Sequence, residues 1–180
     1  MSLDKNGLVE RQSAAELIDH IVNHHHAFTK KKLNEINNGF KELVSNEKNR
    51  TGYINDLLYS FARLKDDLEQ HMRKEEFILF PCIKKLELEL KNNSGNPGSQ
   101  LTERPIRIMQ KEHVQITGLM AGIRSITKDF TPELSAHSEL RLIYESLFKL
   151  EQDLHNHIYL ENNVLFPKVA KLEKKLEILL

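Results

Sequence analysis

The amino-acid sequence predicts an all-α fold, an antiparallel up-down-up-down bundle of four helices, and three observations support it. Apolar residues recur at the three- and four-residue spacing of amphipathic helices in four stretches. The connections between these stretches are short, so sequential helices would pack as neighbours. Finally, HMRKEEFILFPCIKKLE at residues 71–87 returns in altered form as HIYLENNVLFPKVAKLE at residues 157–173. Two of the four helices therefore carry related inward faces.

Length and composition indicate one globular domain. The chain has 180 residues, 39% of them hydrophobic, which is enough for one sizeable core. We expect a single domain at residues 13–180, preceded by an N-terminal extension at residues 1–12. Lys and Arg together number 26, as do Asp and Glu, so no net basic charge exists to attract nucleic acid or an anionic membrane.

Cysteine usage and hydropathy bear on where the protein works. Cys82 is the only cysteine, which excludes an intrachain disulfide framework and any cysteine-based zinc or iron–sulfur motif. The first residues lack the apolar core of a signal peptide, and the chain nowhere approaches the length of uninterrupted apolar sequence that a membrane span needs. We therefore expect a cytoplasmic protein without a membrane span.

The first two helices are expected at residues 13–45 and 53–90. The sequence SAAE at residues 13–16 has the pattern of a capping box, in which the serine and glutamate side chains bond free backbone N–H groups at a helix start. The apolar stripe of the second helix is expected to include Cys82.

The last two helices are expected at residues 105–129 and 132–179. A loop rich in Gly, Pro, Asn and Ser, residues 91–105, leads into the third helix. Pro81 and Pro167 fall inside otherwise continuous helical patterns. Each proline should remove one backbone hydrogen bond and kink its helix.

Two His/Glu pairs lie where apolar side chains are expected. Glu75 follows His71 by four residues, and Glu161 follows His157 likewise, so each glutamate lies about 40° further round its helix, within the apolar stripe. An ionised carboxylate in an apolar core costs several kcal/mol unless it is paired or binds a cation. One such pair would most simply be a structural hydrogen bond, but two pairs on facing stripes favour a metal site.

Histidines on the other two helices complete the candidate site. His113 falls in the apolar arc of the third helix. On the first helix His20 and His24 face solvent, whereas His25 and His26 both lie near the apolar stripe, and helical angle alone does not separate them. The one that is not a ligand would be a buried neighbour that supports a ligand.

Four imidazoles and two carboxylates exceed the four ligands that one zinc ion prefers. They suit two octahedral first-row ions, each with two histidines and shared bridging glutamates, with positions left for an oxo or hydroxo bridge and an exogenous ligand. Nitrogen and hard oxygen donors favour two iron ions, with manganese or zinc as possible substitutes. No Ser, Lys or Cys constellation indicates nucleophilic catalysis, so neither a catalytic residue nor an organic cofactor site is predicted.

Four segments resemble the hemerythrin-like (HHE) superfamily, and within it the repair-of-iron-centres family of di-iron stress proteins. In chain order they are ELIDHIVNHHHAF, HMRKEEFILFP, KEHVQITGLM and DLHNHIYLENNVLFP. The resemblance covers about residues 13–173 and implies a hemerythrin-like four-helix bundle. Carried over residue by residue, it implies bridging by the two glutamates and selects His26 over His25, with a ligand set of His26, His71, Glu75, His113, His157 and Glu161. Glu112 matches an acidic residue beside the third-helix histidine, and it and His25 are the runner-up or supporting positions.

Two departures from the related patterns bear on function. Members of the resembled family commonly carry an N-terminal domain with adjacent cysteines, and this sequence begins at the bundle. Oxygen-carrying hemerythrins have H-x-x-x-H on the third helix, where Thr117 occupies the second position here, and H-x-x-x-x-D on the last, where this chain has H-x-x-x-E. One histidine fewer would leave the irons more open to a substrate and makes reversible oxygen storage a weaker hypothesis.

The leading hypothesis is a cytoplasmic non-haem di-iron protein of the nitrosative or oxidative stress response. It would act by redox chemistry on oxygen, nitric oxide or peroxide, or by supplying iron to damaged iron–sulfur client proteins. A hemerythrin-like module that binds or senses oxygen or nitric oxide without turnover is the first alternative. A structural bundle with a zinc or empty site is the second, and the oligomeric state stays open.

Overall fold

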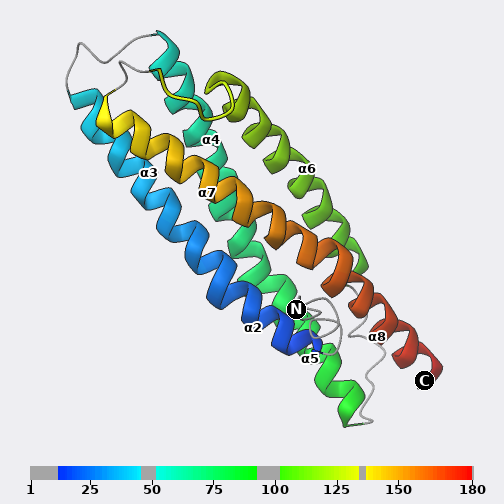
Figure 1. Cartoon of the computed structure of the whole chain (residues 1–180). Coiled ribbons are helices and arrows are strands. Elements are labelled where there is room, and N and C mark those ends of the chain that lie inside the picture. The colour runs from blue at the N-terminus through cyan, green and yellow to red at the C-terminus, as the bar shows by residue number, and fades with distance from the viewer. Residues whose placement is uncertain (1–11, 46–51, 93–101, 134–136, 180) are drawn as a thin grey trace, which may run out of the picture.

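Four long helical segments make up the computed structural model, which describes residues 12–45, 52–92, 102–133 and 137–179. The first segment is α2 (Ala14–His20), η1 (Ile21–His26) and α3 (Ala27–Ser45), and the second is α4 (Gly52–Lys74), η3 (Glu75–Leu79) and α5 (Phe80–Lys91). The third is α6 (Glu103–Ile126), and the fourth is α7 (Ser138–Leu160), η4 (Glu161–Leu165) and α8 (Phe166–Leu179). The described ranges contain no strand, and successive segments run in alternating directions (Figure 1). The predicted all-α four-helix bundle is confirmed.

The extension predicted at residues 1–12 lies outside the described residues except for Gln12. No helix in the described ranges is long and apolar enough to cross a membrane.

The start of the first segment is held by two sets of hydrogen bonds. Ser13 and Glu16 form the predicted capping box: Glu16 N–H donates to the Ser13 hydroxyl at 3.1 Å, and Ser13 N–H donates to the Glu16 carboxylate at 2.7 Å. Ala14 N–H and Ala15 N–H donate to the two carboxylate oxygens of Glu87 on α5, at 3.2 and 3.0 Å. These bonds satisfy N–H groups that a helix start leaves free, and they tie α2 to the second segment.

The third helix ends at Ile126, so the prediction that it reaches residue 129 is wrong. The backbone turns into the left-handed region at Lys128, Asp129 and Phe130, with φ of 50°, 58° and 55°. The Thr127 hydroxyl donates to the Ile123 carbonyl at 2.8 Å and accepts from Phe130 N–H at 3.2 Å. These local bonds replace the next helical turn and stop the helix early.

The fourth segment begins at Ser138, and the prediction of a start at residue 132 is also wrong. Pro132 and Glu133 are not helical, and residues 134–136 lie outside the described ranges. The connection has to carry the chain across the end of the bundle from α6 to α7 (Figure 1). The residues taken for this crossing cannot also form the first turns of the helix.

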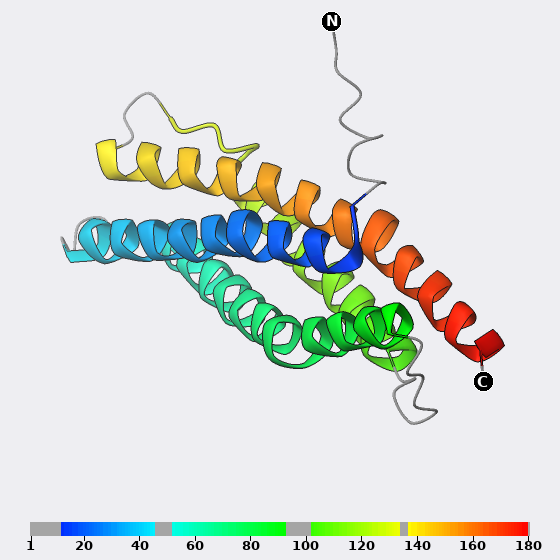
Figure 2. The same ribbon diagram turned by 90° about the horizontal axis from the view of Figure 1, so that it is seen from below.

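Three of the four segments contain a π-helical turn, which the sequence patterns did not reveal. These turns are η1, η3 and η4, and in the last two the closing bond runs five residues back, from Phe80 N–H to the Glu75 carbonyl and from Phe166 N–H to the Glu161 carbonyl. Pro81 and Pro167 directly follow these residues. A proline ring clashes with the carbonyl four residues earlier in an α-helix, and the wider turn relieves that clash. The segment bends where α4 passes through η3 into α5 (Figure 2).

Each π-turn shifts the inward face of the helix that follows. An extra residue in a turn rotates the later side chains by about 100° relative to a continuous α-helix. Cys82, predicted to face inward, is exposed, and the next residue, Ile83, is fully buried instead. The prediction for Cys82 was wrong because it assumed 3.6 residues per turn throughout.

The bundle has two apolar clusters with a polar layer between them. One cluster joins α3, α4, α6 and α7 around Phe40 and Phe61. The other joins α2, α5, α8 and the start of α6 around Phe80 and Phe166. Buried histidines and glutamates from all four segments occupy the level between these clusters.

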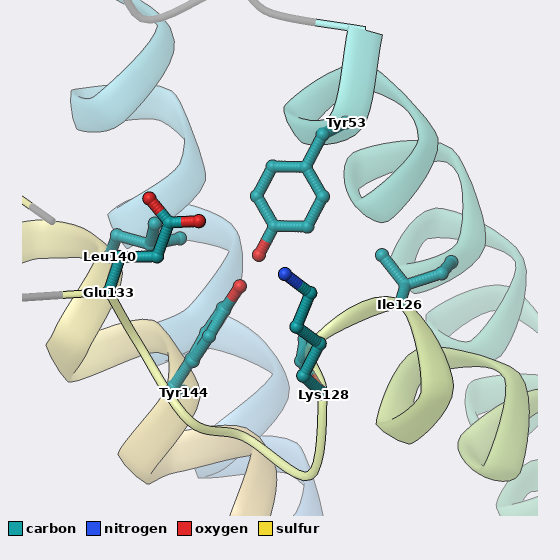
Figure 3. Close-up of a pocket in the computed structure, with 7 residues that line it drawn as sticks. Tyr53, Ile126, Lys128, Glu133, Leu140 and Tyr144 are labelled. Atoms are coloured by element: carbon teal, nitrogen blue, oxygen red, sulfur yellow. The ribbon is translucent and has the colours of Figure 1, made fainter.

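A pocket of about 470 Å³ lies at the end of the bundle where α6 turns toward α7. The Lys128 ammonium group and the hydroxyl groups of Tyr53 and Tyr144 point toward one another across it (Figure 3). This pocket contains none of the predicted site residues.

Gly39 marks a close approach between α3 and α7. A Cβ atom at this position would lie 2.9 Å from Cγ1 of Ile143, which is itself almost fully buried. Glycine is therefore required here by space, since the backbone is ordinary α-helix.

We predict that Gly39→Ala destabilises the protein by about 1–2 kcal/mol, because the overpacking cost exceeds the gain in helix propensity. Gly118→Ala on α6 is the matched control, since a Cβ there meets nothing within 4 Å. That control should raise stability by about 0.5–1 kcal/mol. Urea unfolding of both variants makes the comparison, and equal gains in stability would contradict the close approach.

Candidate metal centre

All six residues predicted as ligands lie in the polar layer, and none is more than 2% exposed. They come from every segment of the bundle: His26 from η1, His71 from α4, Glu75 from η3, His113 from α6, His157 from α7 and Glu161 from η4. Three of the six, His26, Glu75 and Glu161, belong to the π-turns. Such turns are rare and are frequent at functional sites, and here they set the direction of both carboxylates.

The side chains form two groups that share both glutamates. His26 and His157 form one group with Glu75 and Glu161, and His71 and His113 form the other with the same two carboxylates. Within each group, the candidate ligand atoms all lie within 4.8 Å of one another. Two histidines and two shared carboxylates per group match the ligand count predicted for a pair of first-row ions.

Each carboxylate has one oxygen beside each imidazole pair. Glu75 Oε2 lies 3.3 Å from His26 Nε2, and Glu75 Oε1 lies 3.2 Å from His71 Nε2. Glu161 Oε1 and Oε2 lie 3.0 Å from Nε2 of His157 and His113, respectively. The carboxylates therefore span the two groups in the orientation that a bridging ligand requires.

Hydrogen bonds on the outer side of three imidazoles determine which nitrogen faces the centre. His26 Nδ1 lies 2.7 Å from Glu76 Oε1, and His71 Nδ1 lies 3.1 Å from Glu112 Oε2. His113 Nδ1 lies 3.1 Å from Asn162 Oδ1. Because these oxygens accept, Nδ1 is the donor, and a neutral ring then turns the lone pair of Nε2 inward. The Nε2 atoms of facing rings come within 3.1–3.2 Å of each other.

The donor set fits cations better than it fits a network of hydrogen bonds. Both oxygens of Glu75 and Oε2 of Glu161 are buried and make no hydrogen bond of good geometry among the described residues, although imidazole Nε2 atoms lie 3.0–3.3 Å from them. Lone pairs of nitrogen and oxygen thus converge with too few protons between them, which is unfavourable in a dry interior. Two metal ions would satisfy all of these atoms at once, whereas one tetrahedral zinc would leave donors unused.

Without metal, protons have to balance the same charges. Burial lowers the pKa of His71, but the charge of Glu75 and the hydrogen bond to Glu112 outweigh it and raise that pKa to about 10. The His157 pKa is raised because Glu161 outweighs the opposing effect of burial. Burial raises the Glu161 pKa, and the neighbouring His157 and His113 outweigh it, so that this pKa lies well below the ordinary value. The site therefore favours a charged state in which cations, either protons or metals, face two carboxylates.

His25 is the buried neighbour that helical angle could not separate from His26. It belongs to neither group, and its Nδ1 lies 2.9 Å from Asp153 Oδ1 on α7. Its ring stacks on that of His157 at 5.7 Å between centroids, with 8° between the planes. His25 therefore supports a candidate ligand from outside the centre.

Supporting residues were the part that sequence reasoning missed. Glu76 and Asn162 were not predicted, although each directly follows a central glutamate in the repeated motif, and that shared polar position was the available signal. Glu112 was predicted only as a neighbour of His113, and it bonds His71 on the facing helix instead while Lys74 donates to its other oxygen at 2.5 Å. With His71 and Lys74 beside it, the Glu112 pKa falls to about 2.

The histidines outside the two groups, and Thr117 on the third helix, lie away from the centre. His24 and His155 are exposed, and His137 precedes α7 at the far end of the bundle. Thr117 is also exposed, and its hydroxyl donates to the His113 carbonyl at 2.7 Å. The third helix thus contributes one imidazole to the centre.

The part of the chain that forms the bundle is similar to known proteins. Residues 16–169 match the Hemerythrin HHE cation binding domain. The chain is 32% identical over 157 residues to the "Probable iron-sulfur cluster repair protein" of Haemophilus influenzae, covering 87% of this chain and 66% of that protein. It is 34% identical over 154 residues to the "Iron-sulfur cluster repair protein YtfE" of Escherichia coli O157:H7, covering 86% and 65%. The chain spans about two thirds of the length of these curated relatives.

We predict that protein stripped of metal loses stability as pH rises from about 6.5 to about 10. An unfolded histidine has a pKa of about 6.5, whereas His71 in the fold has a pKa of about 10, so between these values only the folded chain holds the proton. The stabilisation is complete below the lower value and is lost as pH passes the higher one. Urea unfolding at several pH values measures it, with His71→Gln as the variant in which the decline should shrink. Parallel pH profiles for the two proteins would contradict the assignment.

We predict that Glu112→Ala lowers metal affinity by about 10- to 100-fold, because His71 loses the acceptor that orients its ring. Glu145→Ala on α7 is the control, since Glu145 is exposed and pairs only with Lys149 among the described residues. Competition with a chelator of known affinity measures both variants. Equal affinity in wild type and Glu112→Ala would show that the outer contact has no part in holding metal.

Proposed function

The chain belongs to the hemerythrin HHE cation-binding family, and we propose that it is a non-haem di-iron protein of the nitrosative or oxidative stress response that maintains iron–sulfur clusters. One observation carries the proposal: Glu75 and Glu161 each offer one oxygen to both imidazole pairs. A carboxylate shared in this way can bridge two metal ions that lie side by side. The relatives are named as iron–sulfur cluster repair proteins, which supports cluster maintenance as the process in which the chain acts.

The proposed ligands divide between two ions. His26 and His157 would hold one, His71 and His113 the other, and Glu75 and Glu161 would bridge them. Iron bound here would supply one-electron redox chemistry toward nitric oxide, oxygen or peroxide, or would itself be the cargo given to a damaged cluster. Manganese or zinc would fit the same donors as substitutes.

The chain's own groups prepare the centre for this role. Glu76, Glu112 and Asn162 hold three imidazoles in the tautomer that presents Nε2. The apolar clusters on either side keep water from the layer, so the charges of the two carboxylates are screened little. The centre is therefore preorganised for metal rather than assembled around it.

Clients and location follow from the same proposal. We propose iron–sulfur proteins as clients, and a cytoplasmic location, which the single cysteine supports because cytoplasmic thiols stay reduced. The chain spans about two thirds of the length of these relatives, so their activity as whole proteins is part of this proposal for the chain.

Ligand binding without turnover is the competing function. Oxygen carriers of the related pattern place a further histidine at the position of Thr117, and Thr117 here is exposed and bonded to its own backbone. The five-histidine arrangement of reversible oxygen storage is therefore not available from the described residues, which supports reaction or iron supply over storage.

We predict that iron-loaded protein restores activity to an enzyme whose [4Fe–4S] cluster nitric oxide has damaged, and that Glu161→Gln reduces the restoration rate at least about tenfold by removing a bridging charge. Glu145→Gln, an exposed change on α7, should behave as wild type. Circular dichroism checks that both variants fold. Full restoration by Glu161→Gln, or none by iron-loaded wild type, would contradict the proposed function.

A further inference from the structure

A series of imidazole rings runs from the surface to the metal centre. His24 is exposed, and its ring stacks on that of His20 with centroids 4.4 Å apart and 27° between the planes. The His20 ring meets the edge of the His25 ring at 5.6 Å, and His25 stacks on His157 at 5.7 Å. The proposed metal centre uses His157 as a ligand and His25 as its support, so the rings of His20 and His24 need another explanation.

The outer two histidines have the sequence spacing of a metal-binding pair. His20 and His24 are four residues apart on one helical segment, a spacing that brings side chains to the same side of a helix. Two histidines at this spacing hold a first-row ion in helical metal motifs. Neither ring forms a hydrogen bond or an ion pair within the part of the chain that the structure describes. Both rings therefore have free nitrogens.

The inner step offers oxygen as well as nitrogen. Asp153 Oδ1 lies 2.9 Å from His25 Nδ1. The other carboxylate oxygen of Asp153, Oδ2, is buried and has no hydrogen-bond partner among the described residues. Burying a carboxylate oxygen without a partner costs free energy unless a cation binds to it. His25 and Asp153 thus lie between the exposed pair and His157 with one donor atom unused.

We propose that His20 and His24 form a capture site for a divalent first-row metal ion, and that His25 and Asp153 pass the ion from this site to the buried centre. The binding of an ion at the pair rests on the four-residue spacing and the 4.4 Å separation of the rings. Stacked rings hold their nitrogen lone pairs in nearly parallel planes, so one ring has to turn for both nitrogens to reach the ion. Its role as the route for iron rests on the proposed function, since a protein that loads or supplies iron needs a path through its apolar shell. His24 is exposed and belongs to η1, the turn that also carries His26, whereas His20 directly precedes that turn and is half-buried.

Nickel is a suitable probe for the pair, because it binds imidazole more tightly than ferrous iron does. Iron-loaded protein, whose buried centre is filled, is titrated with Ni²⁺ by calorimetry. We expect one further equivalent per chain in wild type, and an affinity at least about tenfold lower in His24→Gln. His155→Gln, a change at an exposed histidine on α7 without a ring contact in the described residues, should leave the affinity unchanged. Equal binding by wild type and His24→Gln would overturn the capture site.

Loading kinetics test the route. Metal-free protein is mixed anaerobically with Fe²⁺, and iron retained after rapid desalting is followed with time. His24→Gln should fill several-fold more slowly than wild type and reach the same final content, and Asp153→Asn should also be slower, because it removes the charge beside His25. Wild-type rates in both variants would overturn the route. If wild type takes up no iron, the proposed function fails, while the nickel titration, run then on the protein as purified, still decides the capture site.

Discussion

The structure depends on burying two carboxylates among four imidazoles in a layer that water does not reach. Glu75 and Glu161 are fully buried, with apolar clusters on both sides. Such charges are tolerated only when opposite charge is equally close, and four helical segments meet at one level to bring the imidazoles there. The apolar core is accordingly divided into two clusters, one on each side of that level.

The π-turns are the local solution to this constraint. A straight α-helix would continue one apolar stripe past the histidine and the glutamate, whereas the wider turn at η3 and η4 changes the face presented to the second cluster. The prolines after these turns fit because the carbonyl with which they would clash has moved away. A feature that costs backbone stability thus recurs where the polar layer needs it, which links the motif LFP to the geometry of the centre.

The fold and five of the six central residues were predictable from sequence because they rest on strong energetic signals, whereas only the family resemblance separated His26 from His25. A charged residue in the apolar stripe is costly, and two related copies of H-x-x-x-E made that cost visible. The position of Cys82 was not predictable, because one added residue in a turn leaves the composition of the stripe almost unchanged. The ends of α6 and α7 depend on bonds of Thr127 and on the path across the bundle. The partners of His26 and His71 depend on the relative heights of neighbouring helices, which no single helical pattern contains.

The outer contacts give the site a second level of organisation. Glu76 bonds both His26 and Lys30, and Glu112 bonds both His71 and Lys74, so each carboxylate is itself held by a cation at the surface. The orientation of the imidazoles is thereby linked to the outside of the bundle. His25 and Asp153 extend the same arrangement on the side of η1, where the histidines of the first segment reach solvent.

The central claim is that two ions share Glu75 and Glu161, and X-ray absorption at the iron edge with a count of iron per chain tests it most directly. Two irons per chain and an iron–iron distance of about 3.5–4 Å are expected, since two-metal sites have this separation. One iron per chain, or two irons without an iron–iron contribution to the spectrum, would contradict it.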